Sequence, residues 1–302
     1  MTRVLVTGGS GFLGSSVVRG LTDAGHDVVS ADLRAPAVVM DVTSRDAVRD
    51  VIGSVRPEVV VHLASIVTPG PDSTRELEYA VDVTGTRQVL DACVEHGVRR
   101  VVVSSSGAAY GYHADNPAWI TEDQPVRGNE EFAYSHHKRL VEEMLGSYPS
   151  LEQVVLRIGT ILGSAVDNQI TALFERPRLL RIRGSESPFV FIWDTDVVAI
   201  IQQAVTGTVT GTFNVAGDGA LTITEIAGLL GKPVLTVPEP VLRAALAVGK
   251  RLGLTAYGPE QTMFLQYRPV LANDRLKDVF GYTPSRTSRE AFDEWRRSRG
   301  SY

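Results

Sequence analysis

The side chains best suited to chemistry in this sequence are a tyrosine and a lysine four residues apart, Tyr134 and Lys138. Apolar residues at helical spacing follow them at Leu140, Val141 and Met144, which predicts a helix with the phenol and the ammonium on one face. Tyrosine has an ordinary pKa near ~10 and is a poor base at neutral pH, but an adjacent lysine cation favours the phenolate. We therefore expect Tyr134 to exchange a proton with a substrate hydroxyl.

Three consecutive serines, Ser104, Ser105 and Ser106, follow the apolar run Val101-Val102-Val103. A continuous apolar run is typical of a strand that is buried on both faces of a sheet. Ligands of doubly wound sheets bind at the carboxyl ends of the strands, where these serines are expected. The Ser106 hydroxyl is therefore predicted to hold the same substrate oxygen as Tyr134.

A glycine-rich turn, Thr7-Gly8-Gly9-Ser10-Gly11-Phe12-Leu13-Gly14, joins an apolar strand at residues 3–6 to a segment of helical periodicity. One glycine permits the tight turn, one lets backbone N–H groups approach a phosphate, and one allows the helix to pack closely on the strand. The positive end of the helix dipole adds attraction for the phosphate. The turn therefore predicts a binding site for the pyrophosphate of a dinucleotide.

The glycine turn alone also fits cofactor sensors and proteins that bind nucleotides without chemistry. Tyr134 and Lys138 alone would suit the surface of an amphipathic helix. Their occurrence in order with Ser106 favours catalysis. The expected reaction moves a hydride to or from a nicotinamide, whose oxidised form also favours the Tyr134 phenolate.

The residue that follows the second predicted strand is acidic and indicates which dinucleotide binds. Asp32 stands about 20 residues beyond the glycine turn, where a carboxylate bonds the ribose 2′-OH of NAD and repels the 2′-phosphate of NADP. Arg34 offers a possible phosphate contact, so NADP stays the less favoured alternative. Asp41 and Val42 are candidates for the adenine side, although Asp41 also suits the start of a helix at Ser44.

Strand and helix signals alternate through the first half of the chain. This alternation predicts an α/β protein with a Rossmann-type, doubly wound parallel sheet. Prolines make the pattern irregular after residue 160, which indicates a smaller C-terminal substrate-binding lobe. We assign residues 1–160, with a return at 189–217, to the cofactor domain and 161–188 and 218–302 to the lobe. The expected elements are strands at 27–31, 59–62, 99–104 and 211–215 and helices at 44–54 and 82–96.

Composition is that of an ordinary globular protein, with 43% apolar and 22% charged residues among 302. The net charge of −5 does not favour binding to nucleic acid or to an anionic membrane surface. Cys93 is the only cysteine, so we expect no intramolecular disulfide, no metal site and a cytoplasmic location. The apolar segment 241–254 is interrupted by Arg243, Lys250 and Arg251, and we expect a packed amphipathic helix there instead of a membrane span.

Taken together, the motifs resemble those of the extended short-chain dehydrogenase/reductases of the NAD-dependent epimerase/dehydratase family. The resemblance is dense in the first half of the chain and thin in the second. It is carried by the glycine turn, His62-Leu63-Ala64, Gly85-Thr86, the segment 104–111, the Tyr134/Lys138 pair, Leu156-Arg157, the segment 273–277 and the segment 280–284.

The resemblance implies a site in which Tyr134 is the acid/base, Lys138 also bonds the nicotinamide ribose, and Ser106 positions the substrate oxygen. It also implies a homodimer through the fourth and fifth helices. His136 and His137 are expected on the helix surface, because the tyrosine already fills the role of the base. The cofactor contacts expected are Gly8, Gly11, Phe12, Leu13, Asp32, Leu33, Asp41, Val42, Leu63, Ala64, Ser65, Ser104, Tyr134, Lys138 and Ile158.

Several positions depart from the family pattern. Gly107-Ala108 replaces the Asp-Glu pair of the dehydratases, so a dehydratase is disfavoured. Thr160 and Phe189 stand where sugar-nucleotide epimerases carry an asparagine and an arginine for the diphosphate. Asp82 replaces the asparagine that usually precedes Gly-Thr in the fourth helix.

Two groups of residues in the second half allow alternative interpretations. The arginines either replace the diphosphate ligands or form an exposed basic loop. The aromatic residues either line an apolar substrate pocket or belong to the core. These groups are Arg176, Arg178, Arg181 and Arg183, and Phe189, Phe191, Trp193 and Phe264, respectively.

Three functions remain open on the sequence. The leading one is an NAD-dependent oxidoreductase acting on a secondary alcohol or ketone that is not a standard sugar nucleotide. The second is a nucleotide-sugar 4-epimerase. The third is a non-catalytic sensor that binds NAD(P).

Overall fold

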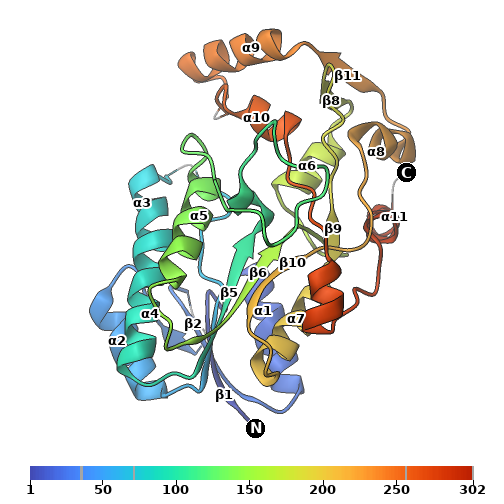
Figure 1. Ribbon diagram of the computed structural model, residues 1–302. Helices are drawn as coiled ribbons and strands as arrows, with labels where there is room; N and C mark the ends of the chain where they lie inside the picture. The colour runs from blue at the N-terminus through green and yellow to red at the C-terminus, as the bar shows by residue number, and fades with distance from the viewer. Residues whose placement is uncertain (35–36, 71, 256, 301–302) are drawn as a thin grey trace.

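The computed structural model describes residues 1–34, 37–70, 72–255 and 257–300 (Figure 1). Its centre is a seven-stranded sheet in the order β10-β6-β5-β4-β1-β2-β3, in which every neighbouring pair is parallel. This arrangement confirms the predicted α/β fold with a doubly wound parallel sheet. The strands are β1 (Arg3–Thr7), β2 (Asp27–Asp32), β3 (Val38–Val39), β4 (Val59–His62), β5 (Arg100–Ser106), β6 (Glu152–Ile158) and β10 (Gly211–Val215).

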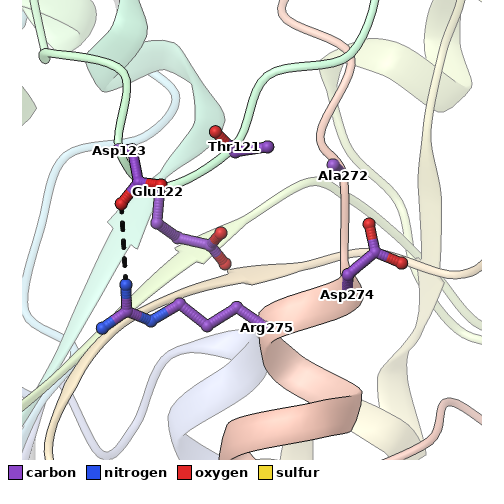
Figure 2. A pocket seen from close by; sticks show the side chains of 6 residues that line it. All are labelled: Thr121, Glu122, Asp123, Ala272, Asp274 and Arg275. Carbon is purple, nitrogen blue, oxygen red and sulfur yellow. Dashed lines mark ion pairs between the residues drawn. The ribbon is translucent and has the colours of Figure 1, made fainter.

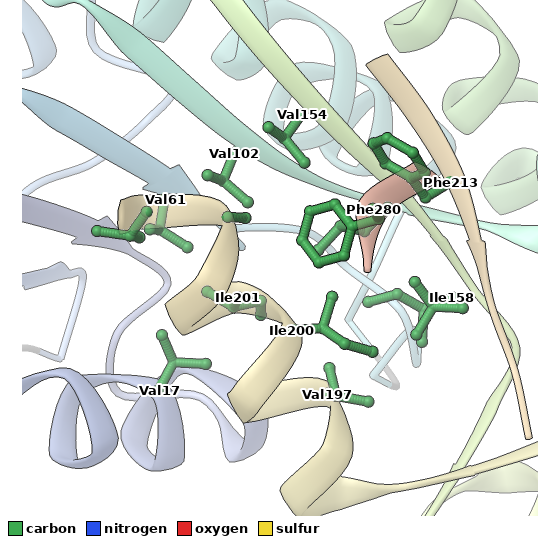
Figure 3. Packing of buried hydrophobic residues seen from close by; sticks show 14 of the residues in the cluster. Val17, Val61, Val102, Val154, Ile158, Val197, Ile200, Ile201, Phe213 and Phe280 are labelled. Atoms are coloured by element: carbon green, nitrogen blue, oxygen red, sulfur yellow. The ribbon is translucent and has the colours of Figure 1, made fainter. Parts of the chain in front are cut away.

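Helices cover both faces of this sheet, which explains why its central strands are apolar throughout. One face packs on α1 (Phe12–Asp23), α7 (Asp194–Thr206) and the π-helical turn η3 (Leu276–Phe280). Figure 3 shows Ile200 and Ile201 of α7 in one cluster with Val102 of β5 and Val17 of α1. The other face packs on α2 (Arg45–Val55), α4 (Gly85–Glu95) and α5 (Ala133–Leu145).

The predicted helix at 82–96 starts earlier and is less regular than expected. It runs from α3 (Arg75–Tyr79) through a π-helical turn, η1 (Ala80–Thr84), into α4. The side chain of Thr74 caps its start by accepting the N–H of Leu77 at 3.2 Å. Its end is marked by Gly97, whose φ of +68° suits glycine.

The lobe consists of two short parallel strand pairs with helices around them. An aromatic core holds it together: Phe189 stacks on Phe191 at 5.8 Å, and Phe174 meets Phe189 edge-on at 5.1 Å. Phe189, Phe191 and Trp193 are therefore core residues, and residues 191–193, which the predicted return at 189–217 includes, pair with residues 160–162 outside the central sheet. The elements are β7 (Thr160–Leu162) with β9 (Phe191–Trp193), β8 (Leu179–Ile182) with β11 (Val234–Val237), α6 (Gln169–Glu175), α8 (Ile223–Leu230), α9 (Glu239–Arg251), α10 (Gln261–Gln266) and α11 (Ser288–Ser298).

Residues 241–251 of the segment 241–254 lie in helix α9, as predicted, but the expectation that this helix is packed is wrong. No residue of α9 is buried, and Val241 and Val248 are each 58% exposed. The helix lies at the outer end of the lobe, where α10 is its neighbour (Figure 1). Within the described part of the chain, no helix has the length and apolar character needed to cross a membrane.

The loop between the 3-10 turn η2 (Gly107–Tyr110) and α5 is fastened to the C-terminal part of the chain. Ile120 donates to Val270 O at 2.7 Å and accepts from Ala272 N at 2.9 Å. Figure 2 shows the two segments side by side, with Arg275 reaching Asp123. That ion pair spans 3.9 Å between exposed side chains and contributes little, so the backbone pairing holds the loop.

Candidate active site

Tyr134 and Lys138 lie in the first two turns of α5 and face the same way, as their spacing predicts. The Lys138 Nζ atom is 5.5 Å from the centre of the Tyr134 ring. It also donates a 2.9 Å hydrogen bond to the carbonyl oxygen of Ser104, at the end of β5. Lys138 is buried and Tyr134 is half-buried. The ammonium is therefore fixed between the end of the sheet and the phenol.

The three serines point alternately to the two sides of β5, as strand geometry requires. Ser105 is buried and donates to Glu142 on α5. The Ser104 hydroxyl donates to His62 O at 3.3 Å. The Ser106 Oγ atom accepts the N–H of Ala108 at 3.2 Å, which leaves its own proton to donate to a ligand.

The glycine turn has the shape required for a pyrophosphate. Gly8 has a φ of +70°, and a Cβ atom there would lie 2.7 Å from Ala64 N. A Cβ atom on Gly14 would lie 2.1 Å from Gly8 O. Gly11 begins α1 without a side-chain cap, and the first turn of α1 holds no acidic residue. The positive end of the helix is therefore open to an anion.

Two of the predicted cofactor contacts are aspartates, and their surroundings differ. Asp32 ends β2, and its carboxylate accepts the N–H groups of Ser10 at 3.1 Å and Arg34 at 3.2 Å. Asp41 accepts from the backbone and the hydroxyl of Thr43 at 2.8 and 2.7 Å, just before the Ser44 cap of α2. Asp32 thus faces the glycine turn, whereas Asp41 shapes the start of α2.

The segment after β4 crosses behind the glycine turn. Leu63 N donates to Thr7 O at 3.1 Å, and Ala64 N donates to the Thr7 hydroxyl at 3.4 Å. His62 joins Thr7 and Thr86 through its two ring nitrogens at 2.7 and 2.9 Å. Burial, helped by the charge of Lys138, lowers the pKa of His62 to about 3, so this imidazole is neutral.

The remaining predicted cofactor contacts differ in how accessible they are. Phe12 and Leu33 are 46% and 60% exposed beside the glycine turn and Asp32, whereas Leu13 is half-buried. Ser65 is half-buried in the segment after β4. The side chains of Val42 and Ile158 pack into the two cores that flank the sheet (Figure 3 labels Ile158).

His137 is not on the helix surface, and that expectation is wrong. Its side chain is 5% exposed, and its Nδ1 atom is 3.0 Å from Oδ2 of Asp82. His136 is half-buried beside it. Burial of His137 depends on a carboxylate from another helix, which the spacing within α5 does not reveal.

The structure also brings an arginine to the site that the sequence pattern missed. The Arg268 guanidinium stacks on the rings of Phe189 and Phe264, at 3.7 and 4.5 Å from their centres. Its Nη1 atom donates to the carbonyl oxygen and the hydroxyl of Ser187 at 2.8 and 3.1 Å. None of the ion pairs found within the described residues includes Arg268, and its buried Nε atom has no acceptor. Burial accordingly lowers its pKa.

Aromatic side chains connect this arginine to the catalytic helix. Phe264 meets the ring of Tyr112 edge-on at 5.4 Å, and Tyr112 meets Phe132 at 5.1 Å. Burial raises the pKa of Tyr112, Tyr134 raises it further and Arg268 lowers it, so Tyr112 lies within electrostatic range of both. Ser187, which holds the guanidinium, has a φ of +33°, a strained value for a residue with a Cβ atom.

Of the four arginines between residues 176 and 183, three are exposed and one is half-buried. Arg176, Arg178 and Arg183 are exposed, and Arg181 pairs with Glu186 at 3.0 Å. The interpretation as an exposed basic stretch therefore fits this segment.

Comparison with known proteins places the chain in a family. The model of the NAD dependent epimerase/dehydratase family matches residues 4–216, and the chain belongs to that family. This membership confirms both the resemblance and the predicted NAD cofactor. An uncharacterized protein of Mycobacterium tuberculosis is 26% identical over 91% of this chain and 72% of its own length.

Other relatives have described activities or bound cofactors. The UDP-glucose 4-epimerase of Azospirillum brasilense is 32% identical over 54% of this chain and 50% of its own length. A short-chain dehydrogenase/reductase superfamily protein from Agrobacterium tumefaciens, solved with NAD, is 25% identical, with a TM-score of 0.75 over 99% of this chain and 97% of that chain. The Bordetella bronchiseptica enzyme WbmG, solved with NAD and UDP, is 21% identical, with a TM-score of 0.77 over 100% and 94% of the two chains, and supports the fold.

Proposed function

We propose that this protein is an NAD-dependent oxidoreductase acting on a secondary alcohol or ketone. The observation that carries the proposal is the placement of Lys138, which lies beside Tyr134 and is bonded to the end of β5. The open glycine turn supplies the pyrophosphate site on the same edge of the sheet. NAD, when bound there, accepts or supplies the hydride.

Each residue of the site has one role in this proposal. Tyr134 exchanges a proton with the substrate oxygen, and Lys138 stabilises the phenolate and holds the nicotinamide ribose. Ser106 donates its free proton to the same substrate oxygen. Asp32 bonds the adenosine ribose, whereas the neutral His62 keeps the segment after β4 against the glycine turn.

Arg268 supports a substrate that carries an anionic group. A partly buried guanidinium without a carboxylate partner is costly, and an anion would offset that cost. Phe264 contacts both Arg268 and Tyr112, and Tyr112 lies within electrostatic range of Tyr134. We therefore place the anionic group of the substrate at Arg268 and its reacting carbon at Tyr134.

The second candidate is a nucleotide-sugar 4-epimerase, which the same arginine favours because a nucleotide sugar carries a diphosphate. Similarity to the epimerase of Azospirillum brasilense also supports it. A sensor that binds NAD(P) without turnover is the third. The homodimer and the cytoplasmic location expected from the sequence stay predictions.

A substrate screen with a Tyr134→Phe control separates these functions. Net NADH formation from an alcohol supports the oxidoreductase, whereas epimerisation of a UDP-sugar without net NADH supports the epimerase. Tyr134→Phe is expected to lower turnover by about 10²–10⁴-fold with NAD binding retained. Unchanged function in that variant would instead support the sensor.

A further inference from the structure

A buried acid–imidazole pair lies directly behind the catalytic residues. Asp82 and His137 have side chains that are 1% and 5% exposed, and they meet at 3.0 Å. The His137 ring also contacts Tyr79 of α3 edge-on, with ring centres 5.6 Å apart. Since His137 precedes Lys138 on α5, the pair anchors the helix at its catalytic end.

The Asp82 carboxylate bonds a second part of the site. Its Oδ1 atom accepts the N–H of Ile66 at 2.9 Å, while Oδ2 faces His137. Ile66 follows Leu63, Ala64 and Ser65, the segment expected to contact the cofactor. One carboxylate therefore joins this segment to α5.

The backbone around Asp82 is itself unusual. Asp82 lies in the middle of η1, the π-helical turn between α3 and α4. Such turns are rare and occur frequently at functional sites. Here the turn carries the carboxylate toward α5 and toward the segment after β4.

Asp82 is ionised despite its burial. Burial acts to raise its pKa, but the His137 hydrogen bond, the charge of Lys138 and the Ile66 N–H together hold the pKa below its ordinary value. The other titratable groups that face this cluster are His62 from β4, Tyr79 from α3 and His136 from α5. His62 is neutral, and burial together with Arg139 lowers the pKa of His136.

We propose that Asp82, held by His137, is a positioning residue for Tyr134 and Lys138. Its negative charge weakens the attraction that the Lys138 ammonium exerts on the Tyr134 phenolate. A carboxylate beside Lys138 offsets part of the attraction that the ammonium exerts on a phenolate. Removal of the Asp82 charge should therefore let Tyr134 lose its proton to solvent more readily. This inference rests on the proposed function.

The test is the pH dependence of kcat/KM in Asp82→Asn, which removes the charge and keeps the shape. For oxidation of an alcohol, in which Tyr134 must be unprotonated, the acidic limb is expected to move to lower pH by about half a unit to one unit, because Tyr134 then ionises more readily. His137→Gln still offers a hydrogen-bond donor to Asp82 and leaves the Asp82 charge in place. The acidic limb of this variant should therefore stay at the wild-type pH. Asp91→Asn is the matched control, because Asp91 bonds Tyr148 at 2.7 Å about 13 Å further along α4.

A titration without turnover separates this inference from the proposed function. The near-ultraviolet phenolate absorbance of each protein, minus that of its Tyr134→Phe version, follows Tyr134 alone. The same downward shift is expected in Asp82→Asn, and it would hold even if no alcohol or ketone were turned over. Should Asp82→Asn fail to fold, the double variant Asp82→Asn/His137→Gln replaces the buried Asp82–His137 pair with two amides that can bond each other, and the same titration is made on it. An unshifted titration in the folded variant would overturn the proposal.

Discussion

The carboxylate of Asp32 accepts the backbone N–H of Ser10 at 3.1 Å, so the residue that ends β2 is in contact with the glycine turn. Its other oxygen accepts the N–H of Arg34 at 3.2 Å. The role in cofactor choice that we propose for Asp32 therefore depends on one side chain whose orientation the backbone determines.

Asp32→Asn is expected to shift preference from NAD toward NADP. The amide keeps an acceptor for the backbone but no longer repels a 2′-phosphate, and each ~1.4 kcal/mol of relieved repulsion is tenfold. We expect the ratio of kcat/KM for NADP to that for NAD to rise about 10–100-fold. Asp23→Asn, at the exposed end of α1, is the control. An unchanged ratio would remove Asp32 from the ribose site.

Gly14→Ala is expected to destabilise the protein and to weaken NAD binding. The added Cβ would lie 2.1 Å from Gly8 O, so the glycine turn must open to admit it. A loss of about 1–3 kcal/mol in the free energy of unfolding is expected from this overpacking. Gly228→Ala in α8, where a Cβ meets nothing within 4 Å, should be neutral or stabilising. Chemical denaturation and NAD titration measure both effects.

Arg268→Met is expected to raise the KM for an anionic substrate by about 10–100-fold with unchanged NAD affinity, because a charge-assisted contact is lost. The methionine can pack between Phe189 and Phe264, and removal of a partly buried cation without a carboxylate partner should leave the melting temperature equal or higher. Arg183→Met, on the surface, is the control. A KM equal to that of the wild type would show that the anion binds elsewhere.

His62 should make the protein less stable as the pH falls. Its imidazole is neutral in the folded state down to about pH 3, whereas an unfolded chain protonates it below its ordinary value of 6.5. The unfolded state therefore binds more protons in that window, and stability rises with pH. Between about pH 6.5 and pH 5, His62 should lower the free energy of unfolding by about 2 kcal/mol.

Unfolding by denaturant in wild type and His62→Gln measures this contribution. The stability advantage of the wild type near neutral pH should shrink by that amount at pH 5, because the other titrating groups are common to both proteins. An advantage that stays constant with pH would contradict a neutral His62.

Local sequence patterns predicted the parts of the molecule that depend on local physics. Continuous valine runs gave β4 and β5 because both faces of these strands are covered, and the spacing of Tyr134 and Lys138 placed both on one face of α5. The glycine turn was equally readable, since steric contact with Gly8 O admits only a glycine at position 14.

Local sequence patterns did not predict the features that depend on residues far away in the chain. His137 was expected in solvent because its burial depends on Asp82, 55 residues away. Arg268 gave no signal, because an unpaired guanidinium is recognised only once the rings of Phe189 and Phe264 surround it. Helix α9 has apolar residues at helical spacing, yet the fold places few neighbours around it.

The position of β10 has a consequence for synthesis of the chain on the ribosome. β10 completes the sheet beside β6, but it is made only after β7, α6, β8, β9 and α7. Until residues 211–215 emerge, β6 presents a seven-residue edge of unpaired backbone groups to neighbouring nascent chains. The opposite edge, β3, has only two residues and offers little to pair with. The interval between translation of β6 and of β10 is therefore the stage at which this protein is most exposed to aggregation.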